Sequence, residues 1–301
     1  MLKIIRMNPW KSISSDGQTI TINKFNGLFN VAPHVTPNWI EANATEIVTA
    51  AVVDVETSGL DFRNDKIIEI AIRTLRFHKP TGHLISVDET YSALQEQNFP
   101  LTAEITRITG IIDQDLKGQN IEWAKVKSLI NKSSLIIAHN AAFDRPFIER
   151  ELGGSTDKVW ACTWKQIDWE AKGFGIKQLA LLCAYHGFFA DAHRALSDVD
   201  ALLHLLSFPD TETQKGYFSE LHFNAHRSHI KLIASGAPFE SKDKLRNQGY
   251  RWNTEIRSWS KMIYADAVPA EVEWLELEVY QGRFLGQLLE IPLMEQFRAV
   301  L

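Results

Sequence analysis

Acidic side chains stand where the sequence pattern passes out of predicted strands. Asp54 and Glu56 end the apolar run IVTAAVVDVET (47–57), and side chains two apart on a strand point to the same face. Adjacent carboxylates repel each other unless a divalent cation lies between them, and Mg²⁺ or Mn²⁺ prefers oxygen ligands. Asp144 follows the predicted strand 133–140, in the first turn of a helix. Each signal alone has an ordinary alternative: a solvated strand end for the pair, and a helix-start aspartate for Asp144.

A histidine and two further aspartates surround the start of a predicted helix. Asp198 lies inside the apolar stretch ALSDVDALLHLL (195–206), where a carboxylate is rarely present for packing. Asp198 and Asp200 cannot share a helix face, because two positions are separated by about 200°. One of them therefore faces the site and the other faces water. His193 precedes this helix and has a pKa range suited to a general base, with a surface histidine as the alternative.

The elements that would position these residues alternate between strands and helices. Apolar or alternating runs predict strands, and apolar stretches with helical spacing predict helices. Gly82 separates two of the strands, which could therefore pair as a meander. The mix predicts an α/β domain over residues 46–210. Its strands are predicted at 47–57, 66–77, 83–94, 133–140 and 159–169, and its main helices at 121–131, 141–154, 176–187 and 194–208.

The order Asp-x-Glu, Asp, His-x4-Asp resembles the DEDDh family of 3′→5′ exonucleases, which are DnaQ-like proteins similar to the polymerase III epsilon subunit. The tyrosine of the DEDDy branch is replaced here by His193. The likeness covers roughly residues 47–208. It rests on five motifs: VVDVETSGL (52–60), KIIEIA (66–71), EITRITGI (104–111), LIIAHNAAFDRPFI (135–148) and AHRALSDVDALLHLL (192–206).

The resemblance implies a ribonuclease H-like fold, a mixed five-stranded sheet flanked by helices, with two divalent metal ions, Mg²⁺ or Mn²⁺. Asp54, Glu56 and Asp198 would hold the first ion, and Asp54 would bridge to the second, which Asp144 supports. His193 would be the general base, and the products would be 5′-mononucleotides.

The same resemblance suggests contacts to the terminal nucleotide of the substrate. For each position, ordinary packing or turn chemistry is the alternative. The candidate substrate-binding residues are Thr57, Leu60, Thr109, Asn140 and Phe143.

Composition limits the class of protein. The 301 residues carry 45% hydrophobic and 23% charged residues, which is typical of a globular chain, and a net charge of −5 gives no global basic field. The two cysteines, Cys162 and Cys183, form no framework, so a reducing compartment is expected. The absence of a signal-peptide pattern and of a long apolar run predicts a cytoplasmic protein without a membrane partner.

The ends of the chain differ from this domain. Residues 1–45 look irregular, with short strands possible at 3–7 and 18–25, and the polar residues 211–223 are predicted to be a linker. Residues 224–264 carry a net charge of +5, and 224–301 are predicted to form a small basic β-α-β module, α+β in class, that ends in a helix over 269–292.

The module allows two interpretations. Its cations and tryptophans could bind nucleic acid, or Trp252 and Trp259 could simply form a small core. The stretch APFESKDKLRNQGYRWN (237–253) resembles a C-terminal extension of some bacterial members of the family.

The function expected is removal of nucleotides from a free 3′ end, with DNA favoured. An exoribonuclease of the same family remains open, as does a non-catalytic or partner-dependent proofreading subunit. No polymerase-binding segment is evident, and no motif decides whether the chain forms a homodimer.

Overall fold

The computed structural model describes residues 11–33, 35–154, 156–210 and 212–299. The chain divides into two compact units, one made of Met1–Ala225 with Phe297–Leu301 and the other of His226–Gln296. The strand expected at 3–7 lies outside the described residues. A three-stranded sheet holds β1 (Lys11–Ile13), β2 (Ile20–Lys24) and β8 (Phe188–Phe189), with β2 antiparallel to β1 and parallel to β8.

A mixed five-stranded sheet forms the centre of the first unit, in the order β5-β4-β3-β6-β7. Strands β3, β4 and β5 form the expected antiparallel meander, and β6 and β7 continue the sheet parallel to β3. This arrangement confirms the predicted fold class. The strands are β3 (Ile47–Thr57), β4 (Ile67–His78), β5 (His83–Leu94), β6 (Leu135–Ala138) and β7 (Val159–Cys162).

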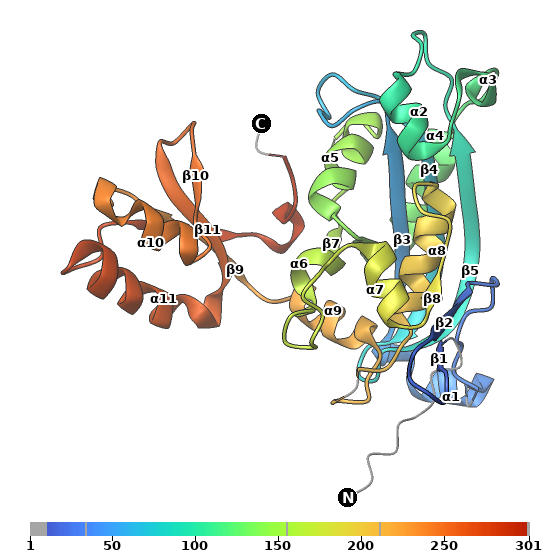
Figure 1. Cartoon of the computed structure of the whole chain (residues 1–301), viewed down its shortest axis with the longest axis horizontal. Coiled ribbons are helices and arrows are strands. Elements are labelled where there is room, and N and C mark those ends of the chain that lie inside the picture. The colour runs from blue at the N-terminus through green and yellow to red at the C-terminus, as the bar shows by residue number, and fades with distance from the viewer. Residues whose placement is uncertain (1–10, 34, 155, 211, 300–301) are drawn as a thin grey trace, which may run out of the picture. The chain divides into compact units, whose positions relative to one another are not determined.

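Helices cover both faces of this sheet (Figure 1), which is why seven of the eleven residues of β3 are apolar, on both sides of the strand. Val53 and Val55 pack with residues of α4 (Trp123–Lys132) and α5 (Ala141–Glu151). Residues of the alternate set, such as Val52, pack with α7 (Leu179–Tyr185), α8 (Ala195–Leu206) and α9 (Tyr217–Ala225). The remaining helical segments of the unit are α1 (Pro37–Ala42), η1 (Ala44–Glu46), α2 (Ala103–Thr109), α3 (Asp113–Leu116) and α6 (Thr163–Gln166).

Two expectations about this unit were wrong. The strand predicted over 159–169 ends at Cys162, whose backbone N–H donates to the Gln166 side chain, and the chain turns into α6. The predicted linker 211–223 is helical from Tyr217 onward, because Tyr217, Phe218 and Leu221 are buried in the core of the unit.

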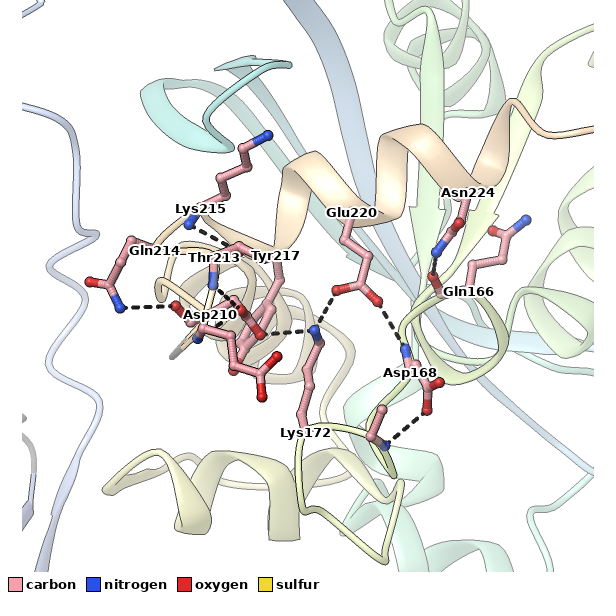
Figure 2. A network of polar contacts seen from close by, with 12 residues as sticks. Gln166, Asp168, Lys172, Asp210, Thr213, Gln214, Lys215, Tyr217, Glu220 and Asn224 are labelled. Atoms are coloured by element: carbon pink, nitrogen blue, oxygen red, sulfur yellow. Dashed lines mark hydrogen bonds and ion pairs between the residues drawn. The ribbon is translucent and has the colours of Figure 1, made fainter.

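A network of charges anchors α9 to the segment after α6 (Figure 2). Lys172 Nζ lies 2.8 Å from Asp210 Oδ2 and 2.7 Å from Glu220 Oε2, and Glu220 also accepts from the backbone N–H of Asp168. The network borders a cavity of about 640 Å³, lined in part by Lys79, Lys172 and Lys215. None of the predicted site residues lines this cavity.

The second unit is a four-stranded antiparallel sheet in the order β10-β11-β9-β12. Helices α10 and α11 and the π-helical turn η4 supply Leu245, Leu275 and Val279 to its small core. The elements are β9 (His229–Ala234), η2 (Phe239–Ser241), α10 (Lys242–Asn247), β10 (Arg251–Asn253), β11 (Ser258–Tyr264), η3 (Ala265–Ala267), α11 (Val268–Leu275), η4 (Glu276–Tyr280), β12 (Gln287–Ile291) and η5 (Leu293–Glu295).

The helix predicted over 269–292 is only half helical. It stops at Tyr280, where Gln281 takes a left-handed conformation (φ 51°), and residues 287–291 form β12 beside β9. Gly286 permits this close pairing, because a Cβ there would overlap the carbonyl oxygen of Ile233. Among the described residues, no helix is both long and apolar enough to span a membrane.

Candidate active site

The C-terminal half of β3 and the start of α8 bring three carboxylates together. Asp54 and Glu56 lie on the side of β3 that faces α8, where Asp198 stands in the first helical turn. One oxygen from each of the three side chains lies within 4.8 Å of the other two. Two strand positions that are two residues apart and one helix position therefore form a cluster, although Asp198 lies more than 140 positions from Asp54 and Glu56 in the sequence.

Asp144 approaches the same strand from the other layer. It is buried in the first turn of α5, and its Oδ1 accepts a hydrogen bond from the backbone N–H of Val55 at 3.2 Å. Asp144 therefore lies beside β3, between the positions of Asp54 and Glu56. Its helix, α5, begins three residues after β6 ends at Ala138.

Burial and mutual repulsion disfavour the charged forms of all four carboxyl groups. Burial, followed by the charge of Asp144, raises the pKa of Asp54 well above its usual range. Burial is also the largest cause for the others, raising the pKa of Glu56 to about 8, of Asp144 to about 7 and of Asp198 to about 6. Within the described residues, none of the four forms an ion pair with Lys or Arg.

This donor set fits divalent cations. Hard ions such as Mg²⁺ bind carboxylate oxygens, and the cations would supply the positive charge that the cluster lacks. Asp54, Glu56 and Asp198 can share one ion, and Asp144 is close enough to Asp54 for its charge to raise the pKa of that carboxyl.

His193 stands in the loop before α8, with its side chain exposed and its backbone in the left-handed region (φ 64°). Its backbone N–H donates to Asp198 Oδ2 at 2.9 Å. The loop and the carboxylate cluster are thus joined by a direct hydrogen bond, and the imidazole remains accessible.

Glu69 is a residue of the site that the sequence analysis did not assign. It is 3% exposed on β4 and stands opposite Glu56 in the strand register. Its carboxylate accepts from Arg194 Nε at 3.2 Å and Nη2 at 3.1 Å and from the backbone N–H of Ala195 at 3.1 Å. A charged residue inside the apolar motif KIIEIA was the available signal, because a buried carboxylate needs partners.

Asp200 does not join the cluster. The expectation that one aspartate of the helix would face water is wrong for this position, because Asp200 binds Arg73 of β4, with Nη2 at 3.0 Å from Oδ2. Its carboxylate is mostly buried in this ion pair. The ion pair fixes α8 to β4 and so helps to set the orientation of the helix that carries Asp198.

The candidate substrate-binding residues are distributed over three segments. Thr57 is buried at the end of β3, where its hydroxyl donates to Gly59 O, and Leu60 is 86% exposed in the loop that follows. Asn140 is the exposed N-cap of α5. Phe143 lies in the first turn of this helix and packs against Phe147 in the following turn.

Among these candidates, Thr109 forms hydrogen bonds on both sides within its own segment. It is buried at the end of α2, its hydroxyl donates to Ile105 O, and it accepts from the backbone N–H of Ile111. These bonds are those of a helix end.

Comparison with known proteins places this site in a family. Residues 51–206 match the family model described as exonuclease, which is more than half of the chain. The chain belongs to the exonuclease family. The matched region begins in β3 and ends with α8. It therefore includes the four carboxylates Asp54, Glu56, Asp144 and Asp198 as well as His193.

Part of the chain is also similar to curated DNA polymerases. A PolC-type DNA polymerase III of Streptococcus pyogenes serotype M1 is 33% identical over 102 residues, covering 33% of this chain and 6% of that protein. The same protein from strain Manfredo of serotype M5 gives the same values. The exonuclease chain thus spans only a small part of the curated relatives that it matches.

Two crystal structures of E. coli Exonuclease I share the fold. The complex with a dT13 oligonucleotide has a TM-score of 0.51 at 14% identity, and the complex with a dA16 oligonucleotide has a TM-score of 0.50 at 15% identity. Each comparison covers 72% of this chain and 63% of the other. The exonuclease unit therefore shares the fold of these structures, and the chain carries an additional C-terminal sheet.

Proposed function

We propose that this protein is a DEDDh-type 3′→5′ exonuclease that releases 5′-mononucleotides, with DNA as its favoured substrate. The carrying observation is the cluster of Asp54, Glu56 and Asp198, with one oxygen of each within 4.8 Å of the others and Asp144 bonded to the same strand. The DNA polymerase relatives and the oligonucleotide complexes of the structural neighbours support the choice of DNA.

Two divalent cations, Mg²⁺ or Mn²⁺, are proposed to complete the site. Asp54, Glu56 and Asp198 would hold one, and Asp54 with Asp144 the other. Bound there, the cations would activate the attacking water and neutralise charge on the scissile phosphate and the leaving oxygen.

The residues of the chain supply positioning and proton transfer. His193 would accept the proton of the attacking water, because its imidazole is exposed while its backbone is fixed to Asp198. Glu69 would hold this loop through Arg194 and Ala195. The exposed Leu60 would contact the terminal base, whose apolar face gives little sequence preference.

The remaining candidate substrate-binding residues would border or shape the site of the terminal nucleotide. Phe143 and Asn140, at the start of α5, would border the terminal nucleotide, and the backbone after Thr57 would contact it. Thr109 would shape the site from α2 rather than donate to the substrate, because its hydroxyl is already bonded. The C-terminal unit would correspond to the extension found in some bacterial members.

The test uses a single-stranded DNA oligonucleotide and its RNA counterpart, each labelled at the 5′ end, with Mg²⁺, Mn²⁺ or EDTA. A ladder that shortens from the 3′ end only with metal supports the proposal, and the faster substrate identifies the sugar. Faster RNA digestion would favour an exoribonuclease. No digestion, together with demonstrated metal binding, would favour a partner-dependent or binding-only subunit.

A further inference from the structure

The helices of the C-terminal unit pack against one face of its sheet. The core residues Leu232 and Ala234 alternate along β9, and Ile263 of β11 stands opposite Ile230 on the same face. Residues of α10, α11 and η4 pack against this set. Because strand side chains alternate, the intervening residues point to the opposite face.

We call that opposite side the open face and define it by Lys231 of β9, Arg251 of β10, Ser260 and Met262 of β11, and Leu289 of β12. The strand register places Lys231 beside both Met262 and Leu289, and Arg251 beside Ser260. Met262 is 51% exposed and Leu289 is 44% exposed, whereas Lys231 is partly buried and its neighbours on this face of β9, His229 and Ile233, are buried. The open face therefore presents one cation between two exposed apolar side chains and a second cation near the edge.

The charged side chains of the open face are all cations. On the four described strands, none of the residues that alternate with the core positions is Asp or Glu. On the side that carries the helices, Glu271 of α11 neutralises Lys261 and Glu278 of η4 neutralises Lys244. The open face is therefore positive, although the opposite charges of the unit as a whole nearly balance.

The cations of the open face have no such partner. Within the residues that the structure describes, neither Lys231 nor Arg251 forms an ion pair, whereas the nearby Arg227 is matched by Asp266. A strand spacing of about 4.8 Å and a rise of about 3.4 Å per residue separate the Cα atoms of Lys231 and Arg251 by roughly 12 Å.

We propose that the open face binds single-stranded nucleic acid, with Lys231 and Arg251 on the phosphates and Met262 and Leu289 against the bases. The two cations complement a polyanion, and the exposed apolar side chains complement unstacked bases, which a duplex hides. The contact would be independent of base sequence, because it uses no side chain placed to read base edges.

The experiment measures binding by the full chain in EDTA, so a failure of the catalytic proposal would leave its result unaffected. The probe is a fluorescein-labelled oligothymidylate, titrated at several salt concentrations and read by fluorescence anisotropy. The test variant combines Lys231→Gln with Arg251→Gln. The matched control combines Lys242→Gln with Arg246→Gln, which removes the same charge from α10 of the same unit.

We expect the test variant to bind roughly ten-fold more weakly, with the salt dependence of log Kd reduced by about 1.4, since each lost phosphate contact contributes about 0.7 for single strands. The control should stay close to the wild type. A third variant, Met262→Ser with Leu289→Ser, should weaken binding without changing the salt dependence, which separates the base contacts from the phosphate contacts.

Three outcomes would overturn the proposal. The first is equal loss of affinity in the test and control variants, which would show that only net charge matters. The second is equally tight binding of a duplex with the same dependence on Lys231 and Arg251, which would remove the single-strand assignment. The third is displacement of the oligonucleotide by polyglutamate at equal charge concentration, which would identify a site for acidic protein instead.

Discussion

Glu69 binds Arg194 through two charge-assisted hydrogen bonds, of 3.1 and 3.2 Å, although the two residues lie on different elements of the exonuclease unit. The same carboxylate accepts from Ala195 N, so it holds both residues that follow His193. The left-handed conformation of His193 is thus fixed from β4 on one side and by the bond to Asp198 on the other.

Glu69→Gln should lower kcat by about ten- to hundred-fold and leave KM for the oligonucleotide nearly unchanged, because a small misplacement of the base costs that much. Glu69 is a positioning residue, so the split between kcat and KM is the informative measurement. Glu89→Gln is the control, since Glu89 also forms ion pairs from the same sheet, with Lys125 and Lys132. Equal kcat values for the two variants would remove the assigned role.

Asp54→Asn should abolish metal-dependent hydrolysis while the fold is retained. A loss of about 4 kcal/mol of transition-state stabilisation corresponds to a thousand-fold lower rate. Without metal, the melting temperature of the variant should equal or exceed that of the wild type, because burial and Asp144 already oppose the charge of Asp54.

Added Mn²⁺ should separate these two proteins in a thermal melt. Saturating metal at about a hundred times Kd stabilises a folded protein by about 2.7 kcal/mol. We expect a rise in melting temperature for the wild type and a much smaller one for Asp54→Asn. Equal shifts in both would place the metal elsewhere.

His193→Asn should reduce kcat by about a hundred- to ten-thousand-fold, the range typical of a general base. Asparagine is the appropriate substitute because it tolerates the left-handed conformation observed at this position, so the loop should keep its shape. The Mn²⁺-induced thermal shift should persist, since Asp54, Glu56 and Asp198 are untouched. A variant with unchanged kcat would exclude His193 as the base.

The network around Lys172 makes part of the stability depend on pH. Burial acts to raise the pKa of Asp210, but the hydrogen bonds from Lys172 and Thr213 outweigh it and bring the pKa to about 2. Because the folded pKa is below the ordinary one, the stabilisation is present near neutral pH and is lost as pH falls toward 2. The shift corresponds to about 2 kcal/mol at pH 7.

Lys172→Met should therefore lower the free energy of unfolding by about 2 to 3 kcal/mol at pH 7 and by clearly less at pH 3. Urea unfolding at the two pH values checks this difference. Lys215→Met, at an exposed lysine of the same cavity, is the control and should change little. The same loss for Lys172→Met at both pH values would contradict the assigned network.

The sequence predicted the parts of the fold that depend on local pattern. The run 47–57 is apolar because both faces of β3 are covered, and this made the strand recognisable. Residues 287–291 could not be recognised as a strand, because β12 is an exposed edge strand whose pairing with β9 depends on a distant part of the chain. The acidic, amphipathic pattern before it extended the predicted helix too far.

In the candidate site, too, the residues placed by local pattern could be predicted and those placed by distant contacts could not. Asp54 and Glu56 were predictable as neighbours because a strand places alternate residues on one side. The ion pair between Asp200 and Arg73 was not, since it requires knowing which face of α8 meets β4. Glu69 was missed for a similar reason: its partners, Arg194 and Ala195, are more than a hundred positions away.

The last described residues of the chain have a consequence for the order of events during synthesis. Phe297 packs against the core beside α5, and Arg298 Nε lies 3.3 Å from Glu149 Oε2, so the exonuclease unit includes residues that follow the second unit in sequence. Closing a loop of about 150 residues adds an entropic cost that grows only slowly with length. These contacts can form only after residues 226–296 have been made, so the exonuclease unit is completed after the second unit.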